Sequence, residues 1–150
     1  MILMEHANTD PFVEAFRGRF QSLMRWEQLD QLWEVLRHDA DNGWHIYAIG
    51  EQPPEEPVSA ELLRTFLSEI SQLLRSEHAE DYCGIVYVDS LEAPAFVKIF
   101  DPNNLGVSCG FSDNPPLPGW ILSRLPPVEM NSSAQLPGNR KRWWQRLLGT

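Results

Sequence analysis

Apolar residues recur at helical spacing in three stretches of the chain. The clearest begins after Ser59, whose hydroxyl suits an N-cap, and its continuous apolar stripe predicts a helix over residues 59–75. Residues 10–24 show a similar period and start with Asp10 and a proline, which is typical of a helix start. Residues 26–36 repeat the pattern. We expect the last two stretches to form a short helical hairpin or one bent helix.

Strands are predicted where β-branched and aromatic residues gather. Residues 44–49, 82–89 and 95–100 have that composition, and residues 107–111 alternate in hydropathy after a turn-forming stretch rich in Asn, Pro and Gly. The last two stretches predict a β-hairpin. The resulting order of helices and strands indicates an α+β fold: a mixed or antiparallel sheet of about four strands, with the helices on one face.

The last third of the chain is punctuated by proline. Between two groups of prolines, residues 120–123 are apolar enough to pack as an edge strand or a helical turn. Residues 131–139 are polar and hold Ser, Gly and Pro, so they predict a linker. We therefore expect one α+β domain over residues 1–130, followed by a linker and a C-terminal tail over residues 131–150.

Composition sets the class of protein. At 150 residues, with 43% hydrophobic and 22% charged residues, the chain suits one globular domain that needs no disulfide or metal to hold it together. The first residues lack the basic start and long apolar run of a signal peptide, and no stretch approaches the roughly 20 apolar residues of a membrane span. Two cysteines are too few for a disulfide framework. We expect a cytoplasmic protein.

Charge is distributed unevenly along the chain. There are 12 basic and 21 acidic residues, for a net charge of −9, yet the basic tail at residues 140–150 contains four cations and no acid. These cations are Arg140, Lys141, Arg142 and Arg146. The acidic remainder repels phosphate groups, so nucleic acid is not expected as a partner.

The basic tail also has an amphipathic pattern. On a helical wheel one side holds the apolar residues Trp143, Trp144, Leu147 and Leu148, and the other holds Arg142, Gln145 and Arg146. An isolated helix this short is marginal in water, so it would gain order by docking. Four outcomes stay open: docking to a protein partner or a dimer mate, docking to the chain's own domain, contact with a membrane surface, and no role.

Only weak candidates for chemistry occur in the sequence. Cys83 and Cys109 are either core residues or, less in keeping with their isolated positions, a redox pair or metal ligands. Cys109 with Asp113 and His45 supplies the residue types of a nucleophile, an acid and a base. However, neither a G-x-S-x-G motif nor a glycine-rich phosphate-binding motif occurs. We therefore predict no catalytic residues, no metal site and no cofactor.

These patterns together predict a small acidic interaction protein, an adaptor or assembly factor, rather than an enzyme. The predicted partner-binding residues are those of the basic tail: Arg140, Lys141, Arg142, Trp143, Trp144, Arg146, Leu147 and Leu148. The indoles would anchor the basic tail in the partner's surface, and the cations would steer the tail toward the partner by charge attraction. Two alternatives stay open: a membrane-surface protein held by the basic tail, and a small enzyme or redox protein that uses Cys109 or Cys83 with His45.

Overall fold

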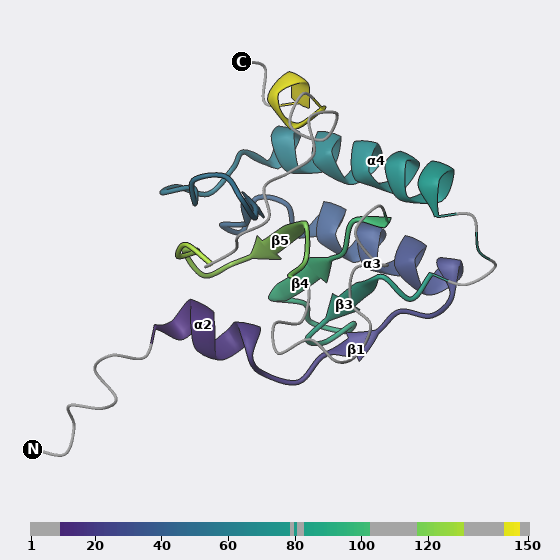
Figure 1. The fold of residues 1–150 in the computed structure, drawn as a ribbon, viewed down its shortest axis with the longest axis horizontal. Coiled ribbons are helices and arrows are strands. Elements are labelled where there is room, and N and C mark those ends of the chain that lie inside the picture. Colours follow the sequence, from purple (N-terminus) through teal and green to yellow (C-terminus); the bar gives the residue numbers. More distant parts are fainter. Residues whose placement is uncertain (1–9, 79, 81–82, 103–116, 131–142, 148–150) are drawn as a thin grey trace, which may run out of the picture.

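A computed structural model describes residues 10–78, 80, 83–102, 117–130 and 143–147 (Figure 1). The labelled elements in this part of the chain are α2 (Pro11–Phe16), β1 (Gln21–Ser22), α3 (Trp26–His38), β2 (His45–Ala48), α4 (Ala60–Glu77), β3 (Val86–Val88), β4 (Phe96–Ile99) and β5 (Trp120–Ser123). Residues 143–147 form a further helical turn, named the C-terminal segment below. The expected α+β class is confirmed, with five strands in the described residues in place of about four.

The strands of the described residues form one antiparallel sheet in the order β1-β3-β4-β5-β2. β5 lies inside this sheet, and its first residue, Trp120, pairs with Ile99 on one side and with Ala48 on the other. The prediction of an edge strand or a helical turn at residues 120–123 is therefore wrong. The neighbouring prolines stop short of the strand, so both of its edges keep the N–H groups that a central strand needs. The strand predicted at residues 107–111 lies outside the described residues.

The N-terminal apolar pattern divides into a helix and a strand. α2 begins as predicted, because the Asp10 carboxylate accepts a hydrogen bond from Phe12 N at 2.8 Å and a proline follows the cap. The helix ends at Phe16, and the N–H of Gly18 donates to the Ala15 carbonyl at 3.1 Å. The predicted continuation of this helix is wrong: glycine has a low helix propensity, and the extended chain beyond it forms β1, which pairs with β3.

The two long helices form as predicted and lie side by side (Figure 1). The Ser59 hydroxyl caps α4 by accepting a hydrogen bond from Leu62 N at 3.1 Å. The Arg64 guanidinium of α4 donates to the Arg37 carbonyl at 3.1 and 3.3 Å. That carbonyl lies in the last turn of α3, where helical carbonyls lack partners within the helix, so the contact ties the end of α3 to α4.

Alternate residues of the sheet divide the core into two clusters. One face, which carries Val97 and Leu122, packs against α3 and α4 and includes Trp144 of the C-terminal segment. The other face, which carries Phe96 and Ile121, packs with Phe12 of α2. Figure 1 shows the same division, with α3 and α4 on one side of the sheet and α2 on the other. The expected placement of helices on one face thus holds for the two long helices, whereas the short α2 covers the opposite face.

Candidate functional site

The C-terminal segment packs on its own domain through aromatic rings, next to α4 (Figure 1). The Phe66 ring of α4 lies edge to face with the indoles of Trp143 and Trp144, with centroids 6.2 Å apart in both pairs. Trp120 of β5 meets Trp143 in the same way at 5.6 Å. Each such pair adds about 0.5–1.5 kcal/mol beyond the burial of its surface. We name these four residues the aromatic cluster.

The C-terminal segment turns its apolar side toward the domain. Trp144 keeps 7% of its surface exposed, and Trp143 and Leu147 are partly buried against the same core. Gln145 and Arg146 are exposed. Within residues 143–147, the two sides of the helical wheel therefore correspond to a side in contact with the chain's own domain and a side in contact with solvent.

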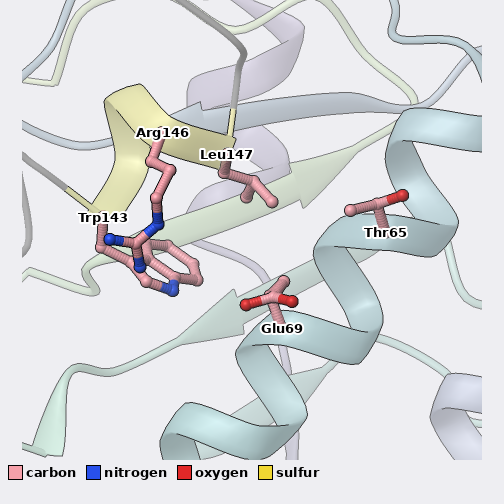
Figure 2. Close-up of a pocket in the computed structure, with 5 residues that line it drawn as sticks. All are labelled: Thr65, Glu69, Trp143, Arg146 and Leu147. Atoms are coloured by element: carbon pink, nitrogen blue, oxygen red, sulfur yellow. The ribbon is translucent and has the colours of Figure 1, made fainter.

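A pocket of about 230 Å³ lies between the C-terminal segment and α4. Figure 2 shows Thr65 and Glu69 on the α4 side, and Trp143, Arg146 and Leu147 on the side of the segment. Within the described residues neither Glu69 nor Arg146 forms a salt bridge. The lining thus combines apolar surface with one carboxylate and one guanidinium that are free to pair with a ligand.

The aromatic cluster contains a buried donor without an acceptor. The indole N–H of Trp120 is buried and finds no hydrogen-bond partner among the described residues, and the same holds for Trp33 of α3. A buried donor that stays unpaired costs about 1–3 kcal/mol. The C-terminal segment therefore contacts the Trp120 ring through Trp143 but supplies no acceptor for its N–H within the described residues.

The structure brings together half of the predicted partner-binding residues, namely Trp143, Trp144, Arg146 and Leu147. The other half lies outside the described residues: Arg140, Lys141, Arg142 and Leu148. Sequence reasoning missed the surface on which the segment docks, which consists of Phe66, Trp120, Thr65 and Glu69. Phe66 belongs to the apolar stripe that predicts the helix over residues 59–75, but a period does not say which distant ring will meet it.

The residues of the enzymatic alternative do not form a site within the described residues. Cys83 is buried, and burial raises the pKa of its thiol, which disfavours the reactive thiolate at neutral pH. His45 is buried in β2, with Nδ1 3.1 Å from the Ser123 carbonyl oxygen. Cys109 and Asp113 lie outside the described residues.

Two other kinds of site are not formed by the described parts of the chain. His, Cys, Asp and Glu side chains nowhere gather there in a group of three or more that could hold a metal ion. Among the helices described, none is both long enough and apolar enough to cross a membrane.

A second arrangement of rings and a cation lies on the opposite face of the sheet. Lys98 Nζ of β4 is 4.0 Å from the ring centroids of both Phe16 and Phe20, and Phe96 contacts both rings. Cation–π attraction holds the ammonium between the two rings, while burial lowers its pKa. We name Lys98, Phe16 and Phe20 the lysine clamp. It joins the sheet to the chain on both sides of the end of α2.

Comparison with known proteins adds no relative to this picture: no protein-family model, no curated protein and no solved structure matches the chain.

Proposed function

We propose that this chain is a small non-enzymatic interaction protein of the cytoplasm, an adaptor or assembly factor, and that its basic tail binds a protein partner. The observation that carries the proposal is the arrangement of the C-terminal segment. Its two indoles contact the domain through Phe66 and Trp120, while Arg146 faces solvent. A segment that docks on one surface through indoles has the chemistry to dock on another, because buried tryptophans are frequent anchors of protein interfaces.

The intramolecular docking is stabilised by a small margin. Burying one tryptophan removes about 150–250 Å² from water, which favours docking by about 4–6 kcal/mol at roughly 25 cal/mol per Å². The partial burial of Trp143 and Leu147 adds to this. Fixing the backbone of residues 143–147 costs about 5–10 kcal/mol of conformational entropy. Because the opposing terms are similar in size, the segment can leave the domain when another surface offers slightly more.

Another protein is a better candidate for the partner than a second copy of this chain. A second copy offers the same aromatic cluster, but the chain's own segment is covalently attached to its domain, and linking two binding modules can give an effective concentration of about 1 mM. Exchange between copies is therefore disfavoured at micromolar concentration. The net charge of −9 on each copy also opposes their approach. A different protein can add contacts that the chain's own domain lacks.

The composition of the basic tail defines the surface that would receive it. Two indoles require an apolar groove, and the four cations of the tail require carboxylates around that groove. Exposed charges are screened over about 8 Å at physiological ionic strength. Binding through the basic tail should therefore weaken as salt is added.

A pull-down with full-length variants tests the proposal. Trp143→Ala/Trp144→Ala removes both anchors. Trp26→Ala is the matched control, because Trp26 lies on α3 next to Arg75 and His78 and outside the aromatic cluster. We expect one specific partner to be retained by the wild type and the control and lost by the double variant, provided that circular dichroism shows all three to be folded. Retention of every partner by the double variant would contradict the proposal.

A further inference from the structure

The C-terminal segment leaves part of the surface beneath it unsatisfied. Two features are incompletely matched within the described residues: the pocket beside Trp143 is unfilled, and Glu69 forms no salt bridge although Arg146 lines the same pocket. The first could take a larger side chain and the second a cation that reaches it. The indole of Trp120, which Trp143 contacts, also keeps a buried N–H without an acceptor among these residues. The segment thus fits this surface, but incompletely.

We propose that the surface formed by Phe66, Trp120, Thr65 and Glu69 is a binding groove for a basic, tryptophan-bearing amphipathic helix of another protein. The C-terminal segment occupies this groove as a tethered competitor. The inference goes beyond the proposed function, because it concerns a surface of this domain that the segment covers. The proposed function concerns a surface of a partner that the basic tail would bind.

The contacts of the C-terminal segment indicate what kind of helix from another protein would fit the groove. Indoles at two successive positions, with a leucine four residues after the first, fit the groove. A helix that keeps this pattern and places a bulkier apolar side chain at the position of Leu147 would fill the pocket, which Leu147 lines (Figure 2). A lysine or arginine next to it would pair with Glu69. The acidic charge of the chain outside the basic tail favours such a basic helix.

A competing helix must overcome the tether of the chain's own segment. A helix of equal intrinsic affinity is blocked at micromolar concentration, because its apparent affinity is reduced by the small fraction of open grooves. A helix that fills the pocket beside Trp143 and pairs with Glu69 makes two contacts that the segment does not make. Each added contact raises its affinity for the groove above that of the tethered segment. The unsatisfied features are therefore what allows a foreign helix to displace the segment.

The test uses full-length chains and a fluorescent peptide with the sequence of residues 140–150. The groove is occupied in the wild type and open in the Trp143→Ala/Trp144→Ala variant. We expect micromolar binding of the peptide to the variant, measured by fluorescence anisotropy, and at least tenfold weaker binding to the wild type. A second peptide that carries Leu147→Trp should bind the variant severalfold more tightly than the first.

Two controls make the result specific to the groove. Phe66→Leu, added to the double variant, should weaken the binding of both peptides at least fivefold, because it removes the ring that both indoles contact. Trp26→Ala leaves the segment docked and should bind the peptide as weakly as the wild type. Equal binding to the wild type and the double variant, binding to neither, or no gain from Leu147→Trp would overturn the proposal.

A second measurement applies if circular dichroism shows the double variant to be unfolded. Wild-type protein with 5-fluorotryptophan gives ¹⁹F signals for its six tryptophans. An excess of the Leu147→Trp peptide should move the signals of Trp143 and Trp144 to the positions of exposed indoles. Unchanged signals would refute the groove. Failure here is separate from failure of the proposed function, because the pull-down reports a partner that the double variant loses and the peptide reports a ligand that it gains.

Discussion

The two faces of the sheet are closed by aromatic rings and cations in opposite arrangements. On the face covered by α3, α4 and the C-terminal segment, which we call the tryptophan face, the indoles pack inward and Arg146 is exposed. On the face covered by α2, the phenylalanine face, the cation itself lies between the rings, because Lys98 is held by Phe16 and Phe20.

This difference indicates which closure can open. The lysine clamp joins β4 to Phe16, the last residue of α2, and to Phe20, the residue before β1. Because β1 and β4 both pair with β3, the sheet holds the clamp from two sides. The C-terminal segment is connected to β5 only through residues 124–142, and its indoles hold it on the domain. We therefore expect the phenylalanine face to stay covered in the native state, whereas the C-terminal segment can detach from the tryptophan face.

The largest effect is expected where the aromatic cluster meets α4. Phe66→Ala deletes a fully buried ring and should cost about 3–5 kcal/mol of unfolding free energy. Phe12→Ala, at an equally buried position on the phenylalanine face, should cost about the same. Only Phe66→Ala should expose the indoles of the C-terminal segment. Urea titration gives the free energies and iodide quenching reports the exposure; equal quenching in the two variants would break the distinction between the faces.

Removing a tryptophan should cost less at the edge of the tryptophan face than in its centre. Trp144→Ala should cost about 1–3 kcal/mol, because the segment can detach instead of leaving a cavity. Trp33→Ala deletes an indole that is 1% exposed, and its cavity should cost about 3–5 kcal/mol. Urea titration measures both values. If the losses are equal, the segment is a fixed part of the core.

Alkaline pH should lower the unfolding free energy through one group on each face, and the decline should begin at a different pH for each group. Burial raises the pKa of Cys83 on the tryptophan face and of Tyr47 on the phenylalanine face, from ordinary values of 9.0 and 10.0. Above those values the unfolded chain releases protons that the folded protein keeps, so the unfolding free energy falls. In urea titrations at successive pH values, Cys83→Ala should remove the decline in unfolding free energy that begins near pH 9. Tyr47→Phe should remove the decline that begins near pH 10.

The titration of Lys98 should have the opposite effect on the unfolding free energy as the pH rises. Its folded pKa lies below the ordinary value of 10.5, so the folded protein releases this proton before the unfolded chain does. The unfolding free energy should therefore gain a contribution as pH rises from the lowered pKa toward 10.5. Lys98→Met should remove this contribution and so steepen the alkaline decline. A curve unchanged by the substitution would mean that Lys98 titrates alike in both states.

The smallest effect is expected from the charge of the lysine clamp at neutral pH. Lys98→Met keeps an unbranched chain between the rings and removes the cation–π attraction, which is worth about 0.5–1 kcal/mol at a partly exposed site. Relief from burying the charge offsets part of that loss. A double-mutant cycle with Phe20→Leu isolates the pairwise energy. A coupling above about 2 kcal/mol would make the clamp a dominant element of the phenylalanine face.

Local patterns predicted the elements that are governed by local physics. The stripe after Ser59 gave α4 its correct start, because capping and helical period are both written in consecutive residues. The same period misled at residues 10–24, where Gly18 and the chance to pair with β3 favour an extended chain. The place of β5 inside the sheet could not be predicted, because it depends on which strands become its neighbours.

The sequence predicted only one of the two surfaces that meet at the candidate site, namely the apolar side of the basic tail. The helical wheel of the basic tail separates its apolar residues from its charged ones, because both kinds occur at regular spacing in consecutive residues. The surface under it combines α4 with β5, and nothing in a one-dimensional pattern brings Phe66 and Trp120 to the same indole, that of Trp143. The lysine clamp was hidden for the same reason, since its three residues come from the end of a helix, a loop and a strand.

We infer that the C-terminal segment is docked on the domain and opens independently of it. Native-state hydrogen exchange of the amides in residues 143–147, measured together with those of α4, tests this most directly. We predict protection of the segment with an opening free energy of about 1–3 kcal/mol, well below that of the amides around Phe66. Absence of protection would contradict the docking, and protection equal to that of α4 would contradict the independent opening.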